Sequence, residues 1–422
     1  WQNFNRTNRS NVCNSMSTIE VNKITPVSGG TTVQVGESGD TINIPSGATI
    51  ANAGTSTGFG DSLRPNAQPL IINGNMAVAQ RSTSVTGITG NGVTTLDRMY
   101  NAISGIGTYT VAQEAQTSGN AFANGFANAY RLDCTTADAS PAAADYLYLQ
   151  YNFEGQDVQV FKKGTANAEK YTLAFWVKSN KTGTGNIQLK DKDNSNRQCT
   201  QSYTISSANT WEHKVCVFGA DTTGAMDDDN AKSLQINWWL GSGTDYSSGT
   251  ANHGTWEAQD NTKVNDGGTL NINDNTANDW SITGIQLEVG EYTSSTLPPF
   301  QQETFSENLN RCCRYFFYTG GGAAYQSHGT GVEASSTAAY CNIPLPNILR
   351  ASPTITFETA IVVWDGNSES TVTSLGNVYY SAHGSLVNVA CNCSGGGLDD
   401  AAGLIVYSSG DSTSGFLIDS EL

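Results

Sequence analysis

Short runs of residues that alternate between apolar and polar side chains, separated by Gly or Asn, extend through most of this chain. Two examples are Tyr146–Tyr151 (YLYLQY) and Tyr171–Lys178 (YTLAFWVK). Because successive side chains of a strand point to opposite faces, this pattern predicts β-strands that bury one face. The 44 Gly and 40 Asn residues favour turns and are poor helix formers, so we expect an all-β protein.

The charge of the chain excludes several kinds of partner. Lys and Arg number 21 and Asp and Glu number 38, which gives a formal net charge of −17. Phosphate binding needs clustered basic residues, so nucleic acid is excluded as a main partner. Docking on an anionic membrane surface is excluded for the same reason. The sequence contains no run of about 18 apolar residues, so we expect no membrane insertion.

The spacing of the strand candidates predicts three regions. Residues 1–66 contain thin, two-sided runs that are too small to bury a core alone. We therefore expect a β-structured stalk or attachment segment that gains its core from other copies of the chain. Residues 67–300 carry many strand candidates with turn signals between them, which predicts a central jelly-roll β-sandwich. Residues 301–422 predict a second, smaller β-sandwich.

Two short segments are helix candidates. Gly155–Phe161 is the first, and it precedes a Lys-Lys-Gly sequence. Thr304–Tyr315 is the second, because Leu309, Cys312 and Cys313 recur at helical spacing. In that segment we expect Ser306 to be the N-cap.

The start of the chain and its cysteines indicate synthesis in a cytoplasm. Trp1–Ser15 is polar and lacks the apolar stretch of a signal peptide, and Met16 begins a more regular segment. We therefore expect Met16 to be the natural start and residues 1–15 to be an extension. The nine Cys residues have irregular spacing, with no zinc-finger pattern, so we expect mostly buried, reduced thiols. A few disulfides formed after release are the alternative.

Several segments from Met16 onward resemble segments of known proteins. They are Gly39–Gly60 (GDTINIPSGATIANAGTSTGFG), Leu70–Arg81 (LIINGNMAVAQR), Thr95–Met99 (TLDRM), Tyr171–Ser179 (YTLAFWVKS), Ile282–Gly290 (ITGIQLEVG), Pro298–Tyr315 (PPFQQETFSENLNRCCRY) and Asn342–Thr356 (NIPLPNILRASPTIT). As a set they resemble phage tail-fibre and receptor-binding proteins, particularly those of marine tailed phages. The middle segments resemble a carbohydrate-binding-module-like jelly roll. Met99 stands where these proteins usually have Trp.

This resemblance implies a virion-attached homotrimer that recognises a host-surface glycan or protein. Several weak sites on one particle would act together and give avidity. The resemblance also implies that the N-terminal segment contacts other virion tail proteins, and that the protein is made in the host cytoplasm and resides on the virion. Two alternatives stay open, a head-fibre or decoration protein without receptor activity and a polysaccharide depolymerase.

The sequence singles out no catalytic site. The four His residues (His213, His253, His328 and His383) are scattered, and Gly-x-Ser-x-Gly, His-Glu-x-x-His and P-loop motifs are absent. Depolymerases use paired carboxylates, but no spacing of the acidic residues picks out a pair. We therefore expect a binding protein that is not an enzyme and requires no cofactor.

One Gly- and Ser-rich stretch combines the side chains that bind sugars. Aromatic faces stack on sugar C–H groups, and a few polar groups fix the hydroxyls. Alternation places Trp238 and Trp239 on opposite faces of one strand, so one should be in the core and the other outward or at an interface. We take Trp239, Tyr246, His253 and Trp256 as candidate ligand-binding residues. A packing or trimer-contact role is the alternative for this stretch.

The C-terminal region offers a second candidate site. Residues 320–336 and 395–415 are rich in Gly, Ser and Asp, and loops of this kind often carry recognition residues. Tyr325 and His328 are the candidate ligand-binding residues here.

Clustered carboxylates offer a candidate calcium site. Asp227, Asp228 and Asp229, and also the pair Asp191 and Asp193, supply the hard oxygen ligands that Ca²⁺ prefers. We take Asp227–Asp229 as a candidate structural calcium site, with a solvated acidic turn as the alternative.

Overall fold

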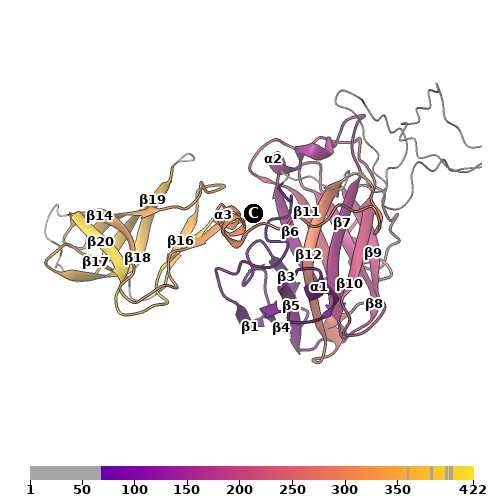
Figure 1. Cartoon of the computed structure of the whole chain (residues 1–422), viewed down its shortest axis with the longest axis horizontal. Coiled ribbons are helices and arrows are strands. Elements are labelled where there is room, and N and C mark those ends of the chain that lie inside the picture. The colour runs from indigo at the N-terminus through magenta and orange to yellow at the C-terminus, as the bar shows by residue number, and fades with distance from the viewer. Residues whose placement is uncertain (1–67, 359–360, 381–383, 395–397, 399–402) are drawn as a thin grey trace, which may run out of the picture. The chain divides into compact units, whose positions relative to one another are not determined.

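The computed structural model describes residues 68–422, apart from 359–360, 381–383, 395–397 and 399–402 (Figure 1). Strands make up most of the regular secondary structure of the described chain, which confirms the all-β prediction. The stalk expected at residues 1–66 lies outside the described residues. Among the described helices, none is long and apolar enough to cross a membrane.

The central region is a jelly-roll sandwich of two antiparallel six-stranded sheets, as predicted. The first sheet consists, in spatial order, of β1 (Ser84–Ile88), β4 (Thr108–Ala115), β5 (Asn128–Thr136), β12 (Asp279–Val289), β7 (Tyr171–Ser179) and β10 (Glu212–Phe218). The second consists of β2 (Gly92–Val93), β3 (Tyr100–Ser104), β6 (Tyr146–Glu154), β11 (Lys232–Ser242), β8 (Gly183–Asp191) and β9 (Gln198–Ile205).

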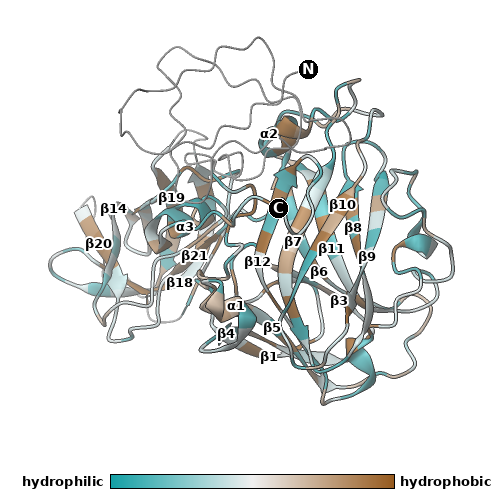
Figure 2. Ribbon diagram, turned by 45° about the vertical axis from the view of Figure 1, so that its right-hand side comes forward, coloured by the Kyte–Doolittle hydropathy of each residue, from teal (hydrophilic) through white to brown (hydrophobic). Residues whose placement is uncertain are grey.

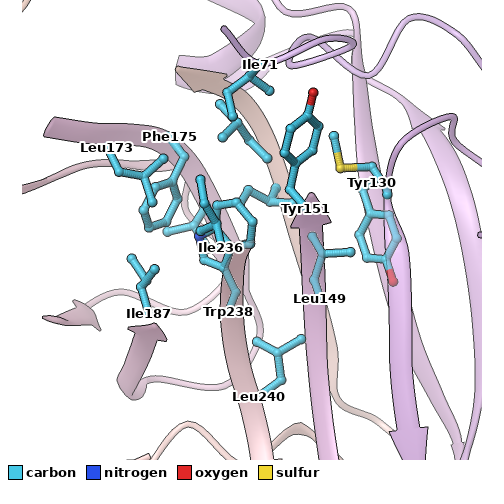
Figure 3. Packing of buried hydrophobic residues seen from close by; sticks show 14 of the residues in the cluster. Ile71, Tyr130, Leu149, Tyr151, Leu173, Phe175, Ile187, Ile236, Trp238 and Leu240 are labelled. Atoms are coloured by element: carbon cyan, nitrogen blue, oxygen red, sulfur yellow. The ribbon is translucent and has the colours of Figure 1, made fainter. Parts of the chain in front are cut away.

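Alternating side chains of the two sheets form the sandwich core. Leu173 and Phe175 of β7 face Ile236 and Trp238 of β11 (Figure 3). The rings of Phe175 and Trp238 meet edge to face, with centroids 6.1 Å apart. Figure 2 shows hydrophobic segments along β7, β10 and β11, whereas the connecting loops are mostly hydrophilic. Burial of these side chains fixes the register of each strand, because a slip by one residue would expose the whole apolar set.

The C-terminal region closes into a barrel instead of the expected small sandwich. The barrel strands, in spatial order, are β14 (Ser327–Ser335), β15 (Ala338–Pro344), β19 (Leu386–Cys393), β18 (Glu369–Tyr380), β17 (Ile361–Trp364) and β20 (Gly403–Ser408). Strand β20 pairs with both β14 and β17, so the sheet has no free edge. A three-stranded sheet is formed by β13 (Phe316–Tyr318), β21 (Phe416–Asp419) and β16 (Thr354–Phe357).

The helices are few and short. They are α1 (Gly119–Ala123), α2 (Gly155–Val158), α3 (Phe305–Cys312) and three 3₁₀ turns, η1 (Gln159–Phe161), η2 (Asn261–Lys263) and η3 (Ile272–Asp274). Both predicted helices are therefore present, the first as α2 followed by η1. The N-cap of α3 is Thr304 and not Ser306, because Thr304 and Glu307 form a reciprocal capping box.

The last residues of the chain lie against one end of the second sheet. The Glu421 carboxylate lies 2.6 Å from the guanidinium of Arg98. The Asn152 amide donates a hydrogen bond to the Leu422 carbonyl at 3.1 Å. Arg314 donates two hydrogen bonds, each 2.7 Å long, to the Glu154 carboxylate at the end of β6. These contacts cover that end of the sheet and leave the other end to the loops.

The cysteines fit the prediction of buried thiols. Within the described residues, eight Cys residues are buried and carry no disulfide. Burial raises the pKa of the Cys199 and Cys216 thiols to about 12, so both stay protonated and unreactive. Packing, rather than redox chemistry, accounts for these side chains.

Candidate functional site

One face of the second sheet is polar. We call it the outer face, because it is turned away from the sandwich core. In β11, Leu234, Ile236 and Trp238 belong to the core, so Gln235, Asn237 and Trp239 point the other way. The same alternation places three residues of β6 and three of β8 on this face: Tyr148, Gln150, Asn152, Asn186, Gln188 and Lys190.

Strand register arranges these side chains in rows across the sheet. Trp239 of β11 lies opposite Tyr148 of β6 and Asn186 of β8. In the next row, Asn237 lies opposite Gln150 and Gln188. One end of the outer face is therefore aromatic, and amides follow it along the strands.

Four aromatic rings gather at the aromatic end. The Trp239 ring lies 4.6 Å from that of Tyr148 and 5.2 Å from that of Tyr246, between centroids. The Tyr146 ring lies 5.4 Å from Tyr148 and 5.7 Å from Tyr246. The three tyrosines are half-buried, and Trp239 is almost fully covered behind them. We call these four residues the aromatic group.

The aromatic group forms one wall of a cleft of about 170 Å³. The remaining lining residues come from the outer face and from the segment that follows β11. They are Gln188, Lys190, Gln235, Asn237, Gln259, Asn261 and Val264. Strands that are held by the core thus supply most of the cleft, so its shape is largely preformed.

A chain of hydrogen-bonded amides forms the cleft floor. Asn237 donates from Nδ2 to Gln188 Oε1 at 2.9 Å, and Gln188 donates from Nε2 to Gln198 Oε1 at 3.0 Å. Gln198 in turn donates to the Asp260 carbonyl at 2.9 Å. Because each amide is held by the next, their free donors and acceptors keep fixed directions.

Two buried polar atoms of the cleft residues have no hydrogen-bond partner among the described residues. They are the indole Nε1 of Trp239 and the side-chain Oδ1 of Asn237. Both atoms are buried beneath the cleft surface, so a ligand group reaches them only if a neighbouring side chain moves. Unsatisfied buried polar atoms are uncommon in proteins, and here two lie next to the same cleft.

Burial also shifts the ionisation of the cleft residues. Burial raises the pKa of the Tyr148 hydroxyl, and the neighbouring Tyr146 and Tyr100 add to the shift. Burial lowers the pKa of Lys190, and the nearby Lys192 ammonium lowers it further. Tyr148 is therefore a neutral hydrogen-bonding group at neutral pH.

The structure brings together two of the four candidates in the 239–256 stretch. Trp239 and Tyr246 both belong to the aromatic group. Trp256 instead packs in the sandwich core, where its indole donates to the Gly219 carbonyl at 2.8 Å and its ring lies 5.8 Å from that of Tyr171. His253 is exposed in a turn, outside the cleft lining. These positions favour packing for Trp256, and ligand binding by either residue stays a prediction.

The two C-terminal candidates occupy different environments. Tyr325 is 67% exposed, and its ring lies 6.3 Å from that of Tyr407. His328 is buried, with its ring 6.0 Å from that of Phe416. Burial lowers the pKa of His328, which keeps the imidazole neutral at neutral pH. Their roles in ligand binding stay predictions.

The carboxylates expected to bind calcium do not converge. Asp227, Asp228 and Asp229 are all exposed, and no three acidic, His or Cys side chains of the described residues are grouped to hold a metal ion. Asp191 is already paired, because the Lys163 ammonium lies 2.6 Å from it and 3.1 Å from Asp221. The Lys163 ammonium also donates to the Thr223 and Gly224 carbonyls at 2.8 and 2.9 Å. The calcium site therefore stays a prediction.

Most cleft residues were not among the sequence candidates. Tyr146 and Tyr148 alternate with core leucines in the sequence, as Gln235 and Asn237 alternate with Ile236 and Trp238. The pattern YLYLQYN predicts a strand with a Tyr- and Gln-bearing face. It does not predict which other strand continues that face.

Comparison of this chain with known proteins finds weak similarity. No protein-family model and no curated protein matches this chain. The chain is similar to the enzymatically active domain of tailspike protein 4 of bacteriophage CBA120, with 13% identity and a TM-score of 0.26 over 52% of this chain. That match covers 21% of the tailspike chain, so this chain spans about a fifth of its length.

This chain is also weakly similar to two carbohydrate-binding modules. One is a family 11 module from Clostridium thermocellum in complex with a β-1,3-1,4-mixed-linked tetrasaccharide, with 11% identity and a TM-score of 0.24, covering 50% of this chain and 98% of that one. The other is TmCBM61 in complex with β-1,4-galactotriose, with 7% identity and a TM-score of 0.24, covering 53% of this chain and 99% of that one.

Proposed function

We propose that this protein binds glycans in the cleft on the outer face of the second sheet. The observation that carries the proposal is the aromatic group beside a floor of fixed amides. Aromatic rings supply apolar surface for the C–H faces of a sugar, and amides supply donors and acceptors for its hydroxyls. Neither group needs a cofactor or a chemical step to act.

A glycan array with the full chain tests this function. The wild type is expected to bind a defined subset of the array, and Tyr246→Ala is expected to lose most of that signal. Tyr325→Ala tests the second candidate site, because it removes an exposed ring of the C-terminal region. Loss of binding in Tyr325→Ala with retention in Tyr246→Ala would move the site to the C-terminal loops.

We also propose that binding proceeds without cleavage of the glycan. Glycosidases need two carboxyl groups across the scissile bond. The residues that line the cleft, all of them within the described chain, include no Asp, Glu or His. Overnight incubation with a bound polysaccharide should therefore leave its size distribution unchanged in size-exclusion chromatography. Shortened products would favour the depolymerase alternative.

At the level of the particle, we propose a virion tail fibre that attaches to the host cell as a homotrimer. The resemblance of the sequence to phage tail-fibre proteins supports this role, with residues 1–66 contacting other tail proteins. The barrel adds support, because each of its six strands exposes a large apolar side chain: Val332, Tyr340, Trp364, Tyr379, Leu386 and Ile405. Exposed apolar surface of this kind often marks protein–protein contacts.

Light scattering tests the assembly. A solution mass near three times 44.7 kDa is expected for the full chain. A chain that begins at Gly60 shows whether the first residues hold the trimer together. A monomeric mass for both chains would remove avidity and favour the decoration-protein alternative.

A further inference from the structure

Lys190 is a cation in the cleft lining that has no ion-pair partner among the described residues. It lies on β8, opposite Gln235 of β11 and Gln198 of β9, and it lines the cleft with the amides. No carboxylate of the described residues lies within 4.0 Å of its ammonium, and no described residue accepts a hydrogen bond from it. Seven other lysines of the described chain have a carboxylate partner: Lys162, Lys163, Lys170, Lys178, Lys181, Lys214 and Lys263.

The surroundings of Lys190 lack negative charge despite the acidity of the whole chain. The net charge is −17, yet the cleft lining contains this lysine and no Asp or Glu. The acidic residues on either side of the cleft residue Gln259 in the sequence have partners of their own. Glu257 pairs with Lys263 at 2.8 Å, and the Asp260 carboxylate accepts hydrogen bonds from Thr262. The cleft therefore presents one positive charge to a ligand.

The Lys190 ammonium and the aromatic group belong to different rows of the outer face. Lys190 shares a row with Gln235, and Trp239 lies four residues further along β11. At about 3.3 Å per residue, the two rows are roughly 13 Å apart. This separation is longer than one pyranose ring, so an oligosaccharide is needed to reach both.

We propose that the cleft selects acidic oligosaccharides, whose carboxylate or sulfate group binds the Lys190 ammonium while another sugar ring lies on the aromatic group. This inference rests on the proposed glycan-binding function. An anionic group would supply the missing partner of a partly buried cation, and such charge-assisted hydrogen bonds are stronger than neutral ones. The lowered pKa of Lys190 agrees with this, because burial disfavours the charged ammonium and no neighbouring carboxylate offsets that effect.

Affinity electrophoresis of the full chain in polysaccharide gels tests the inference. Two matched pairs separate the anionic group from the sugar backbone: polygalacturonate against its methyl ester, and a sulfated galactan against its desulfated form. The wild type is expected to be retarded more by the anionic member of one pair. The pair that shows the preference identifies the group as a carboxylate or a sulfate.

Variants assign the preference to Lys190. Lys190→Gln is expected to weaken binding to the anionic member by about tenfold or more, while Lys190→Arg retains it. Lys170→Gln is the control of equal charge change, because Lys170 pairs with Glu291 on the surface. Thermal melting of each variant checks that it folds.

Three outcomes would contradict the inference. Equal retardation by both members of each pair overturns the acidic preference and leaves glycan binding standing. A Lys190→Gln variant that keeps the wild-type preference places the anionic group elsewhere and overturns the role of Lys190. Absence of retardation by every polysaccharide, charged or neutral, overturns the proposed function and the inference together.

Discussion

The rings of Trp239 and Tyr148 lie 4.6 Å apart between centroids, on two hydrogen-bonded strands of the second sheet. Their neighbours in sequence, Trp238 and Leu149, are buried in the sandwich core. Because those core positions fix the register of β11 and β6, they also fix the aromatic contact on the opposite face. The candidate site is therefore built on strands, and only Tyr246 and the residues after it come from a loop.

A substitution at Tyr246 tests the aromatic group with little effect on the stability of the fold. Tyr246→Ala is expected to lower glycan affinity by about tenfold, because an aromatic contact contributes ~1 kcal/mol beyond its buried area. The thermal midpoint should change little, since the side chain is half-buried and lies outside the core cluster. Titration calorimetry with the best array glycan measures the affinity. Unchanged affinity in a folded Tyr246→Ala variant would place the ligand elsewhere.

Trp256 should affect stability and not affinity. Trp256→Ala is expected to lower the free energy of unfolding by about 3–5 kcal/mol, because it leaves a cavity in the sandwich core. Trp364→Ala is the matched control, since this Trp is 40% exposed on the barrel. Urea denaturation compares the two variants. If Trp256→Phe keeps its stability but loses glycan binding, Trp256 contacts the ligand after all.

Lys163 is a buried cation whose removal should be costly. Its side chain is 1% exposed, and the Asp191 side chain is fully buried. Lys163→Met is expected to lower the free energy of unfolding by about 3–5 kcal/mol, because it leaves buried carboxylates without their partner. The double variant Lys163→Met/Asp191→Asn should be less destabilised than the sum of the single variants, as measured by chemical denaturation. Strict additivity would show that the pair is not coupled.

Chelation is expected to leave the protein unchanged. The carboxylates of Asp191 and Asp221 are neutralised by Lys163 and Arg197, and Asp227–Asp229 are exposed. The thermal midpoint of the protein should therefore be the same with excess EDTA and with millimolar Ca²⁺. A higher midpoint in Ca²⁺ that is lost on replacing Asp227–Asp229 by Asn would establish the calcium site.

Asp97 should give the protein a distinct dependence of stability on pH. Burial raises its pKa to about 6, although hydrogen bonds from Gln80 and the charge of Arg81 oppose the shift. In the unfolded chain the pKa is about 4, so between about pH 4 and pH 6 the folded state holds a proton that the unfolded state has lost. The contribution of Asp97 to stability therefore falls as the pH rises through this window.

The comparison with Asp97→Asn isolates this effect. The free energy of unfolding of the wild type, minus that of the variant, should decrease between about pH 4 and pH 6 and stay constant above it. Urea denaturation at a series of pH values measures the difference. A difference that does not change with pH would show that Asp97 titrates normally. The constant offset from the altered hydrogen bond to Gln80 does not affect the slope.

The sequence predicted the sandwich because its strands carry local signals. Tyr171–Lys178 and Tyr146–Tyr151 alternate clearly, and Gly and Asn mark the turns. The same alternation predicted that Trp238 and Trp239 would point to opposite faces, and burial of Trp238 with Trp239 in the aromatic group confirms it. The barrel was not predicted, because closure depends on β20 pairing with two strands distant in sequence.

The sequence by itself determined the strands, the face on which each side chain lies and the polarity of that face, because these follow from a period of two residues. Only the tertiary structure decided that β6, β8 and β11 are neighbours, that Tyr246 joins their aromatic end and that Trp256 turns into the core. It also decided that Lys190 has no carboxylate partner among the described residues. Pairing between distant strands is set by packing of the whole core, and no local preference encodes it.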